Sequence, residues 1–186
     1  MHKRRIAAIT VAVLLAGVAA VTFSQDKPLV VTANKPSVDG VVKDGEYTFT
    51  HDFDDKLTLY ASRTEDTLYF AVAGHTEGWV SVGLGTKKMD GSVILMGFVD
   101  PDGKVSFKTE IGKGRRHVDA PPDISADVIS YAMKQEGGTT TLEVAVKAAP
   151  FIKQGQSSLD VIFAIGKDRS FTKYHSYRGT TSLALQ

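Results

Sequence analysis

The sequence predicts an all-β sandwich of roughly ten short strands. Short apolar or alternating runs recur at the spacing typical of such sandwiches. Turn signals built from Gly, Asp, Asn and Pro separate these runs, and no convincing amphipathic helix pattern interrupts them. The 186 residues, 42% of them hydrophobic, are enough for one domain with a sizeable core.

The individual strands follow from the alternation of side chains. In Leu57–Ser62 apolar and polar residues alternate, and Thr67–Gly74 repeats the pattern after a short polar turn, so the two are expected to form a hairpin. Leu159–Gly166 is the most continuously apolar run and is expected to be central. Gly112–Asp123 is expected to be irregular, because it is rich in Gly and Pro. The expected strands are Leu29–Ala33, Thr48–Phe53, Leu57–Ser62, Thr67–Gly74, Trp79–Leu84, Ser92–Val99, Lys104–Ile111, Val128–Lys134, Thr140–Val146, Leu159–Gly166 and Thr181–Leu185.

The N-terminus has the pattern of an export signal. A basic segment, His2–Arg5, precedes the apolar run Ile6–Phe23, and small residues stand before Gln25 at the expected cleavage site. Residues 1–24 are therefore predicted to be a signal peptide and residues 25–186 the folded domain. An uncleaved membrane anchor is the alternative, since the apolar run is near the lower length limit for a span. Both interpretations place the domain outside the cytoplasmic membrane, periplasmic or extracellular.

Charge and cysteine content exclude several classes of function. Without Lys3, Arg4 and Arg5, the chain has 19 basic residues against 21 acidic ones, which argues against a nucleic-acid surface. The chain has no cysteine, which excludes disulfides, zinc–thiolate sites, iron–sulfur clusters, a thiol nucleophile, covalent haem attachment and a blue-copper site.

No familiar catalytic motif is present, so the chain is not expected to be an enzyme. The sequence has no G-x-S-x-G elbow, no H-E-x-x-H and no credible phosphate-binding loop. The five histidines are far apart in sequence. There are two groups of acidic residues, Asp52/Asp54/Asp55 and Asp100/Asp102. The first is expected to cap a strand end and the second to belong to a turn, with a calcium site as the alternative at either.

One loop is unusual. Between the apolar runs Trp79–Leu84 and Ser92–Val99 lies the polar segment Gly85–Gly91, which carries Met89 between Lys88 and Asp90. A methionine used as core filler normally lies within an apolar run. Met89 is therefore an apolar, soft sulfur at the rim of a sheet, where functional side chains are commonly presented.

The order and spacing of these residues resemble the DOMON family, over almost the whole chain after the leader. The resemblance implies an immunoglobulin-like β-sandwich of ten or eleven antiparallel strands. It is carried by Asp39-Gly40-Val41, Gly45-Glu46-Tyr47, Trp79, Gly83, Met89-Asp90-Gly91-Ser92, Asp100, Gly103, Ala164-Ile165-Gly166, His175, Gly179 and Leu183, and more loosely by Pro121-Pro122-Asp123.

Some members of this family bind haem b and others bind carbohydrate. The resemblance to the haem members implies that Met89 and His175 are the axial iron ligands. Such six-coordinate iron has no open position, so the implied function is electron transfer with a membrane cytochrome or an extracytoplasmic redox enzyme. Trp79, Phe98, Tyr174 and Tyr177 are then candidates for walls of the haem slot. Lys87, Lys88 and Arg178 are candidates for contacts with the propionates.

Several alternatives stay open from sequence. A lone loop methionine or histidine is commonly a surface residue, and Trp79 is also a plausible core residue. His117 is the second choice as axial ligand should His175 prove remote. A related subunit of molybdenum oxidoreductases uses lysine in place of the histidine, which makes Lys173 a further candidate. A non-enzymatic carbohydrate-binding module would need an exposed aromatic platform, for which Tyr47, Tyr60, Tyr69 and Tyr131 are candidates.

Overall fold

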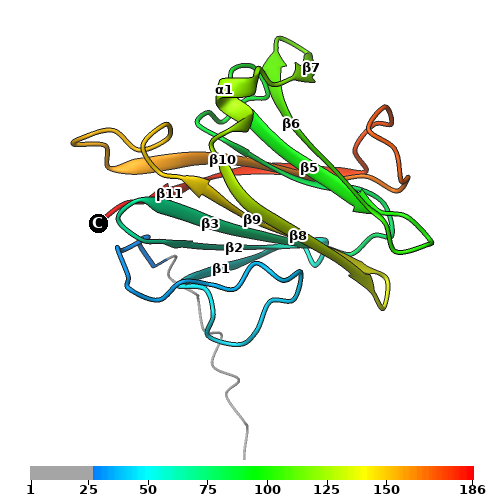
Figure 1. The fold of residues 1–186 in the computed structure, drawn as a ribbon, viewed down its shortest axis with the longest axis horizontal. Coiled ribbons are helices and arrows are strands. Elements are labelled where there is room, and N and C mark those ends of the chain that lie inside the picture. The colour runs from blue at the N-terminus through cyan, green and yellow to red at the C-terminus, as the bar shows by residue number, and fades with distance from the viewer. Residues whose placement is uncertain (1–26) are drawn as a thin grey trace, which may run out of the picture.

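Two antiparallel sheets packed face to face form the molecule (Figure 1), as the computed structural model describes it for residues 27–186. One sheet has the strand order β1-β2-β3-β9-β8, and the other has the order β11-β10-β4-β5-β6-β7. The all-β sandwich expected from sequence is thereby confirmed. The elements are β1 (Phe49–Phe53), β2 (Leu57–Arg63), β3 (Thr67–Gly74), β4 (Val80–Leu84), β5 (Val93–Val99), β6 (Val105–Lys113), β7 (Arg116–Asp119), α1 (Pro122–Ser125), β8 (Val128–Glu136), β9 (Thr139–Lys147), β10 (Ser158–Ile165) and β11 (Tyr177–Ala184).

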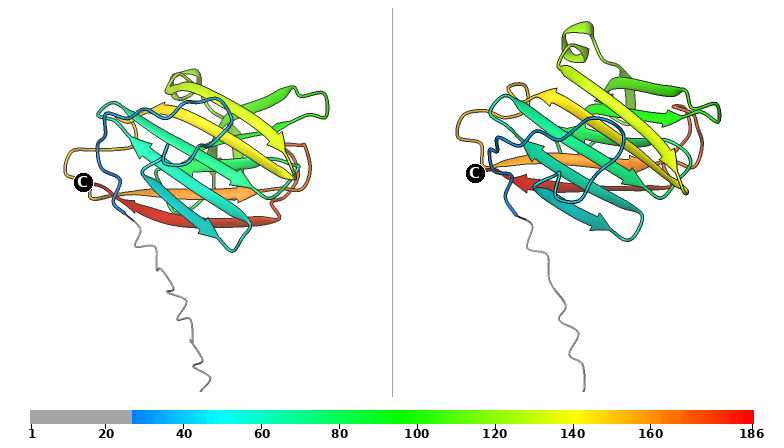
Figure 2. Two further views of the ribbon diagram at one scale, coloured as in Figure 1. Left: turned by 90° about the horizontal axis from the view of Figure 1, so that it is seen from below. Right: turned by 60° about the horizontal axis from the view of Figure 1, so that its bottom comes forward.

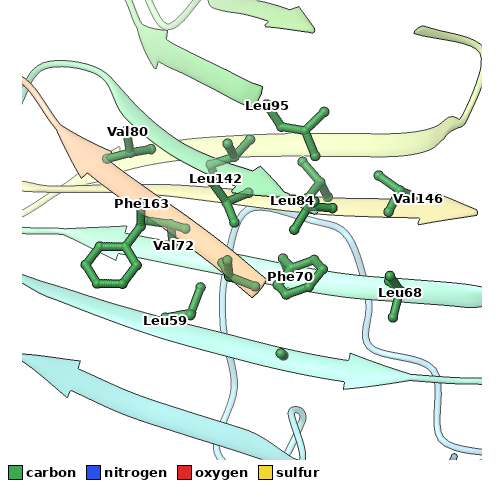
Figure 3. Packing of buried hydrophobic residues seen from close by; sticks show 14 of the residues in the cluster. Leu59, Leu68, Phe70, Val72, Val80, Leu84, Leu95, Leu142, Val146 and Phe163 are labelled. Atoms are coloured by element: carbon green, nitrogen blue, oxygen red, sulfur yellow. The ribbon is translucent and has the colours of Figure 1, made fainter. Parts of the chain in front are cut away.

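The core lies between the two sheets, where the inward side chains of each sheet meet (Figure 3). Leu59, Phe70 and Leu142 come from the five-stranded sheet, and Leu84 and Phe163 come from the six-stranded sheet. All five are essentially inaccessible to solvent. The period-two alternation seen in the sequence therefore sets which face of each strand is buried.

The structure differs from the sequence expectation at three places. Gly112–Asp123, expected to be irregular, continues β6 to Lys113 and adds β7, which pairs antiparallel with it. Leu29–Ala33 forms only two isolated bridges, from Leu29 to Leu185 and from Val31 to Arg63. Strand β10 was expected to be central, but it lies between β11 and β4, one strand from the edge of its sheet.

Residues 36–48 lie across the outer face of the five-stranded sheet (Figure 2, left). Tyr69 is buried beneath this covering segment together with Tyr47, the segment's own inward side chain, and burial raises the pKa of the Tyr47 phenol. The expected signal peptide, residues 1–24, lies outside the described residues. Within residues 27–186 no helix has the length and apolar character needed to span a membrane.

Candidate functional site

The outer face of the six-stranded sheet carries an apolar cluster that the sandwich core does not include. Strand β5 directs Ile94, Met96 and Phe98 to this face, and Trp79 joins them at the start of β4. These four side chains are only 3–7% exposed, although no third sheet lies over them. We name Trp79, Ile94, Met96 and Phe98, with the Met89, Ala164 and Phe171 side chains packed on them, the outer-face cluster.

Met89 reaches the outer-face cluster because its loop bends back over the sheet. The loop is held by a hydrogen bond from the Gly91 N–H to the Gly112 carbonyl (3.0 Å) and one from the Ser92 hydroxyl to the Lys88 carbonyl (2.7 Å). A Cβ at Gly112 would lie 1.6 Å from the Met89 carbonyl oxygen, so only glycine permits this approach. The unusual loop methionine thus packs on a sheet face and is half-buried there.

Trp79 occupies the opposite end of the cluster from the Met89 loop. Its indole lies against Gly166, where an added Cβ would come within 2.0 Å of the indole nitrogen. That nitrogen, Nε1, is buried and has no hydrogen-bond partner among the described residues. Buried N–H groups are normally satisfied, so this one marks a place where an additional acceptor would be favourable.

The β10–β11 loop supplies the rest of the cover. Phe171 packs on Phe98 with 4.8 Å between the ring centroids, and Lys108 Nζ lies 5.3 Å from the Phe171 centroid. Arg169 anchors the loop by donating from Nε to the Val99 carbonyl (3.0 Å). Near the end of the loop, the Ser176 N–H bonds the Ile165 carbonyl at 2.7 Å.

The structure places Met89 and His175 at opposite ends of this sheet face. The Met89 loop connects Leu84 to Val93, whereas His175 precedes β11. Leu84 pairs with Val161 on β10, whereas the His175 loop starts beyond Ile165 at the far end of that strand. In Figure 1 the His175 loop is the orange-red loop on the right. His175 is exposed, and its side chain is not among those packed on the outer-face cluster.

The other residues expected at the site are distributed around the same face. Tyr174 is 93% exposed, and Lys88 is exposed at the Met89 end. Arg178 pairs with Ala164 of the cluster and is exposed. Tyr177 instead points toward the core and donates its hydroxyl proton to Asp54 (2.8 Å). Of the nine residues expected to contact the cofactor, Met89, Trp79 and Phe98 belong to the outer-face cluster.

A buried carboxylate that sequence reasoning missed lies beside the Met89 loop. Glu110 on β6 pairs with Ile94 and is 5% exposed. Its carboxylate contacts Nδ1 of His117, and Lys108 Nζ lies 3.8 Å from its other oxygen. A carboxylate that holds one imidazole nitrogen fixes the ring and leaves the other nitrogen available, as in many metal-bound histidines.

His117 consequently lies closer along the sheet to Met89 than His175 does. It pairs with Gly112, the residue against which the Met89 carbonyl packs. The sequence could not reveal this relationship, because it depends on β7, which was expected to be irregular. Within residues 27–186 no group of three or more His, Asp or Glu side chains is arranged to hold a metal ion.

The aromatic platform expected for carbohydrate binding is not formed as anticipated. Tyr69 is 8% exposed beneath residues 36–48, and Tyr47, which belongs to that segment, is 7% exposed. Tyr60 is half-buried beside Tyr47, and burial raises its pKa. Tyr131 is exposed on edge strand β8, where it stacks on Phe107 with 3.9 Å between centroids. These four tyrosines therefore do not share one open surface.

Comparison with known proteins agrees with this architecture. The family model described as DOMON domain matches residues 52–176. The crystal structure of the cytochrome b domain of pyranose dehydrogenase from Coprinopsis cinerea superposes with a TM-score of 0.56 at 12% identity, covering 73% of this chain and 80% of that one. A family 9 carbohydrate-binding module from Caldicellulosiruptor kristjanssonii, in complex with glucose, gives a TM-score of 0.46 at 11% identity and covers 84% of this chain and 85% of that one. No curated protein sequence matches this chain.

Proposed function

Because this chain belongs to the DOMON domain family, we propose that it is a haem b-binding electron-transfer domain whose cofactor lies on the outer-face cluster. The observation that carries the proposal is the burial of four large apolar side chains on a sheet face that only two loops cover. An apolar sheet face suits a flat, apolar macrocycle, because binding would replace the apolar cover of Met89 and Phe171 with another apolar cover.

The residues at this face fit such a cofactor in their chemistry. Met89 offers a thioether, which suits ferrous iron, and its side chain already packs on the cluster. The unpartnered Trp79 Nε1 offers a hydrogen-bond donor. Arg178 and Lys88 are exposed near opposite ends of the face, so they are alternative sources of positive charge for the propionates, which share one edge of the macrocycle. Bound haem would supply one-electron chemistry, and the protein would hold it, exclude water and tune its potential.

Two histidines compete for the second axial position. The family resemblance favours His175, which would hold the iron together with Met89, although the structure places the two loops at opposite ends of the face. His175 would have to move onto the cluster, because Phe171 of the same loop packs there. His117 lies nearer to Met89 and is already oriented by Glu110. Met89 with His175 remains our proposed pair, with His117 as the alternative.

The location of the domain and its redox partner are proposed from the sequence. We propose that the domain is exported, on the pattern of residues 1–24, and that it exchanges electrons with a membrane-bound redox protein rather than catalysing a reaction itself. Carbohydrate binding is less well supported, because the tyrosines expected to form a platform lie apart or are buried.

The decisive experiment is reconstitution of the full-length protein with hemin, followed by absorption spectra before and after dithionite. A sharp low-spin ferrous α band is expected, and it should disappear in Met89→Ala. Loss of the band in His175→Ala but not in His117→Ala would identify His175 as the second ligand, and the reverse result would identify His117. Absence of hemin binding, together with retention on a polysaccharide column, would overturn the proposal in favour of a carbohydrate-binding module.

A further inference from the structure

A second potential binding site lies at the end of the sandwich where β2 ends. Two hollows open there, and Arg63 and Ile152 line both of them. The larger has a volume of about 440 Å³. Its position away from the outer-face cluster makes it independent of the proposed haem function.

Arg63 occupies a position that normally belongs to an apolar residue. Along β2, Leu57, Leu59 and Ala61 point into the core and are at most 1% exposed, and Arg63 is the next residue in that row. Its backbone is fixed, because its carbonyl accepts the Thr32 N–H at 2.9 Å. The long side chain therefore starts in the core row and extends into the hollows at the end of the sandwich.

One donor of the half-buried Arg63 side chain has no partner within residues 27–186. Nε of Arg63 is buried and has no hydrogen-bond partner among the described residues. No acidic group of residues 27–186 lies within ion-pair distance of it, although Glu65 and Asp66 line the larger hollow. Burying an unpaired charged donor is unfavourable, so an added acceptor would be stabilised there.

The walls of the hollows are built independently of any ligand. The Ala148 N–H bonds the Asp66 carbonyl at 2.8 Å, and the Ile152 N–H bonds the Ala148 carbonyl at 2.9 Å. Phe151, 9% exposed, anchors this loop in the core. The lysines at the rim already have partners, since Lys147 pairs with Asp127 (3.2 Å) and Lys153 donates to the Ala149 carbonyl (2.9 Å). Among the basic side chains that line the two hollows, Arg63 is therefore the one whose side chain has no partner within residues 27–186.

We propose that Arg63 anchors a binding site for a small organic monocarboxylate. One edge of a guanidinium presents two parallel N–H groups that match the two oxygens of a carboxylate. Glu65 and Asp66 at the rim disfavour a doubly charged anion such as phosphate. Ile152 and Leu185 provide an apolar wall for the carbon portion of the ligand. A free organic acid and the acid group of a sugar would both supply such a carboxylate.

The test uses nuclear magnetic resonance of the full-length protein, observing the Arg63 Nε–H signal. Propionate, glucuronate and inorganic phosphate serve as probes, each compared with chloride at equal ionic strength. Propionate or glucuronate is expected to shift the Arg63 signal in a saturable way. A tighter response to glucuronate would identify a sugar acid as the ligand class, and a tighter response to propionate would identify a free organic acid.

Two substitutions complete the test. In the Arg63 variants binding is followed on the backbone amide signals of Ile152 and Leu185, which line the hollow. Arg63→Gln is expected to weaken carboxylate binding at least tenfold, and Arg63→Lys should weaken it as well, because lysine keeps the charge but not the paired donors. Arg115→Gln, which removes an exposed arginine of the β6–β7 turn, should bind as the unaltered protein does. The proposal is wrong if no carboxylate shifts the Arg63 signal beyond the chloride control, if phosphate binds more tightly than both carboxylates, or if Arg63→Gln binds as well as Arg115→Gln.

Discussion

The outer faces of the two sheets both carry apolar clusters, but they are covered in different ways. On the five-stranded sheet, Tyr69 and Ala145 lie beneath residues 36–48, whose own Tyr47 packs with them. On the six-stranded sheet, the outer-face cluster lies beneath single side chains, Met89 and Phe171, from two separate loops. One cover is a continuous segment of chain, whereas the other is formed by the tips of two loops.

The covers also differ in how they are attached. Glu143, fully buried on β9, accepts hydrogen bonds from the Asp39 N–H (3.0 Å), the Gly40 N–H (2.7 Å) and the Tyr47 hydroxyl (2.8 Å). Such bonds to a carboxylate are stronger than neutral ones. Phe171 rests on the outer-face cluster by ring packing, and Arg169 of the same loop donates to the Val99 carbonyl (3.0 Å) and pairs with Glu77 (3.2 Å). The first cover is therefore tied to a buried carboxylate, whereas our proposal requires the second to give way to a ligand.

The largest expected effect comes from removing the attachment on the closed face. Glu143→Ala leaves two buried N–H groups and a tyrosine hydroxyl without their acceptor, and should lower the free energy of unfolding by about 3–5 kcal/mol. Urea denaturation measures the loss, and limited proteolysis should then cleave within residues 36–48. Glu143→Gln, which retains one acceptor oxygen, should lose less. Equal stability of Glu143→Ala and the unaltered protein would contradict a permanently fixed cover.

Alkaline pH should weaken the same face. The pKa of Tyr47 is raised in the folded protein, first by burial and then by the hydrogen bond to Glu143. Above pH ~10 the unfolded chain releases this proton while the folded chain retains it, so stability falls as the pH rises, by up to about 1.4 kcal/mol per pH unit. Tyr47→Phe should show a shallower decline between pH 9 and 11 in thermal unfolding. An identical decline in both proteins would assign the alkaline loss to other groups.

The smallest expected effect concerns the replaceable cover. Phe171→Ala removes one half-buried ring from the outer-face cluster and should lower the free energy of unfolding by only about 1 kcal/mol. Hemin affinity should stay equal or increase, because the substitution uncovers the face. A large loss of stability, approaching that of Glu143→Ala, would show that the loop is a fixed part of the fold.

Sequence alone predicted the fold because its strands obey local rules. Leu57 and Leu59 alternate with Thr58 and Tyr60, and tight turns such as that around Gly103 close the hairpins. Strand β7 was missed because its polar residues and the flanking Gly114 suggest a loop, whereas pairing with β6 stabilises it as a strand.

The candidate site was only partly predictable. Met89 stood out because a soft apolar side chain in a polar loop has no local explanation, and the structure places it on the cluster. Glu110 gave no signal, because its burial depends on β7 and on the contact with His117. The position of His175 relative to Met89 also depends on strand order, which side-chain alternation does not encode.

The most direct test of the haem proposal is to locate hemin on the protein by nuclear magnetic resonance. Ferric iron broadens nearby amide signals, so adding hemin to the full-length protein maps its position. The account predicts loss of signals from Met89, Met96 and Phe98, with those of Tyr47 and Glu143 on the opposite sheet retained. Broadening centred on the Tyr47–Glu143 face, or no broadening at either face, would contradict it.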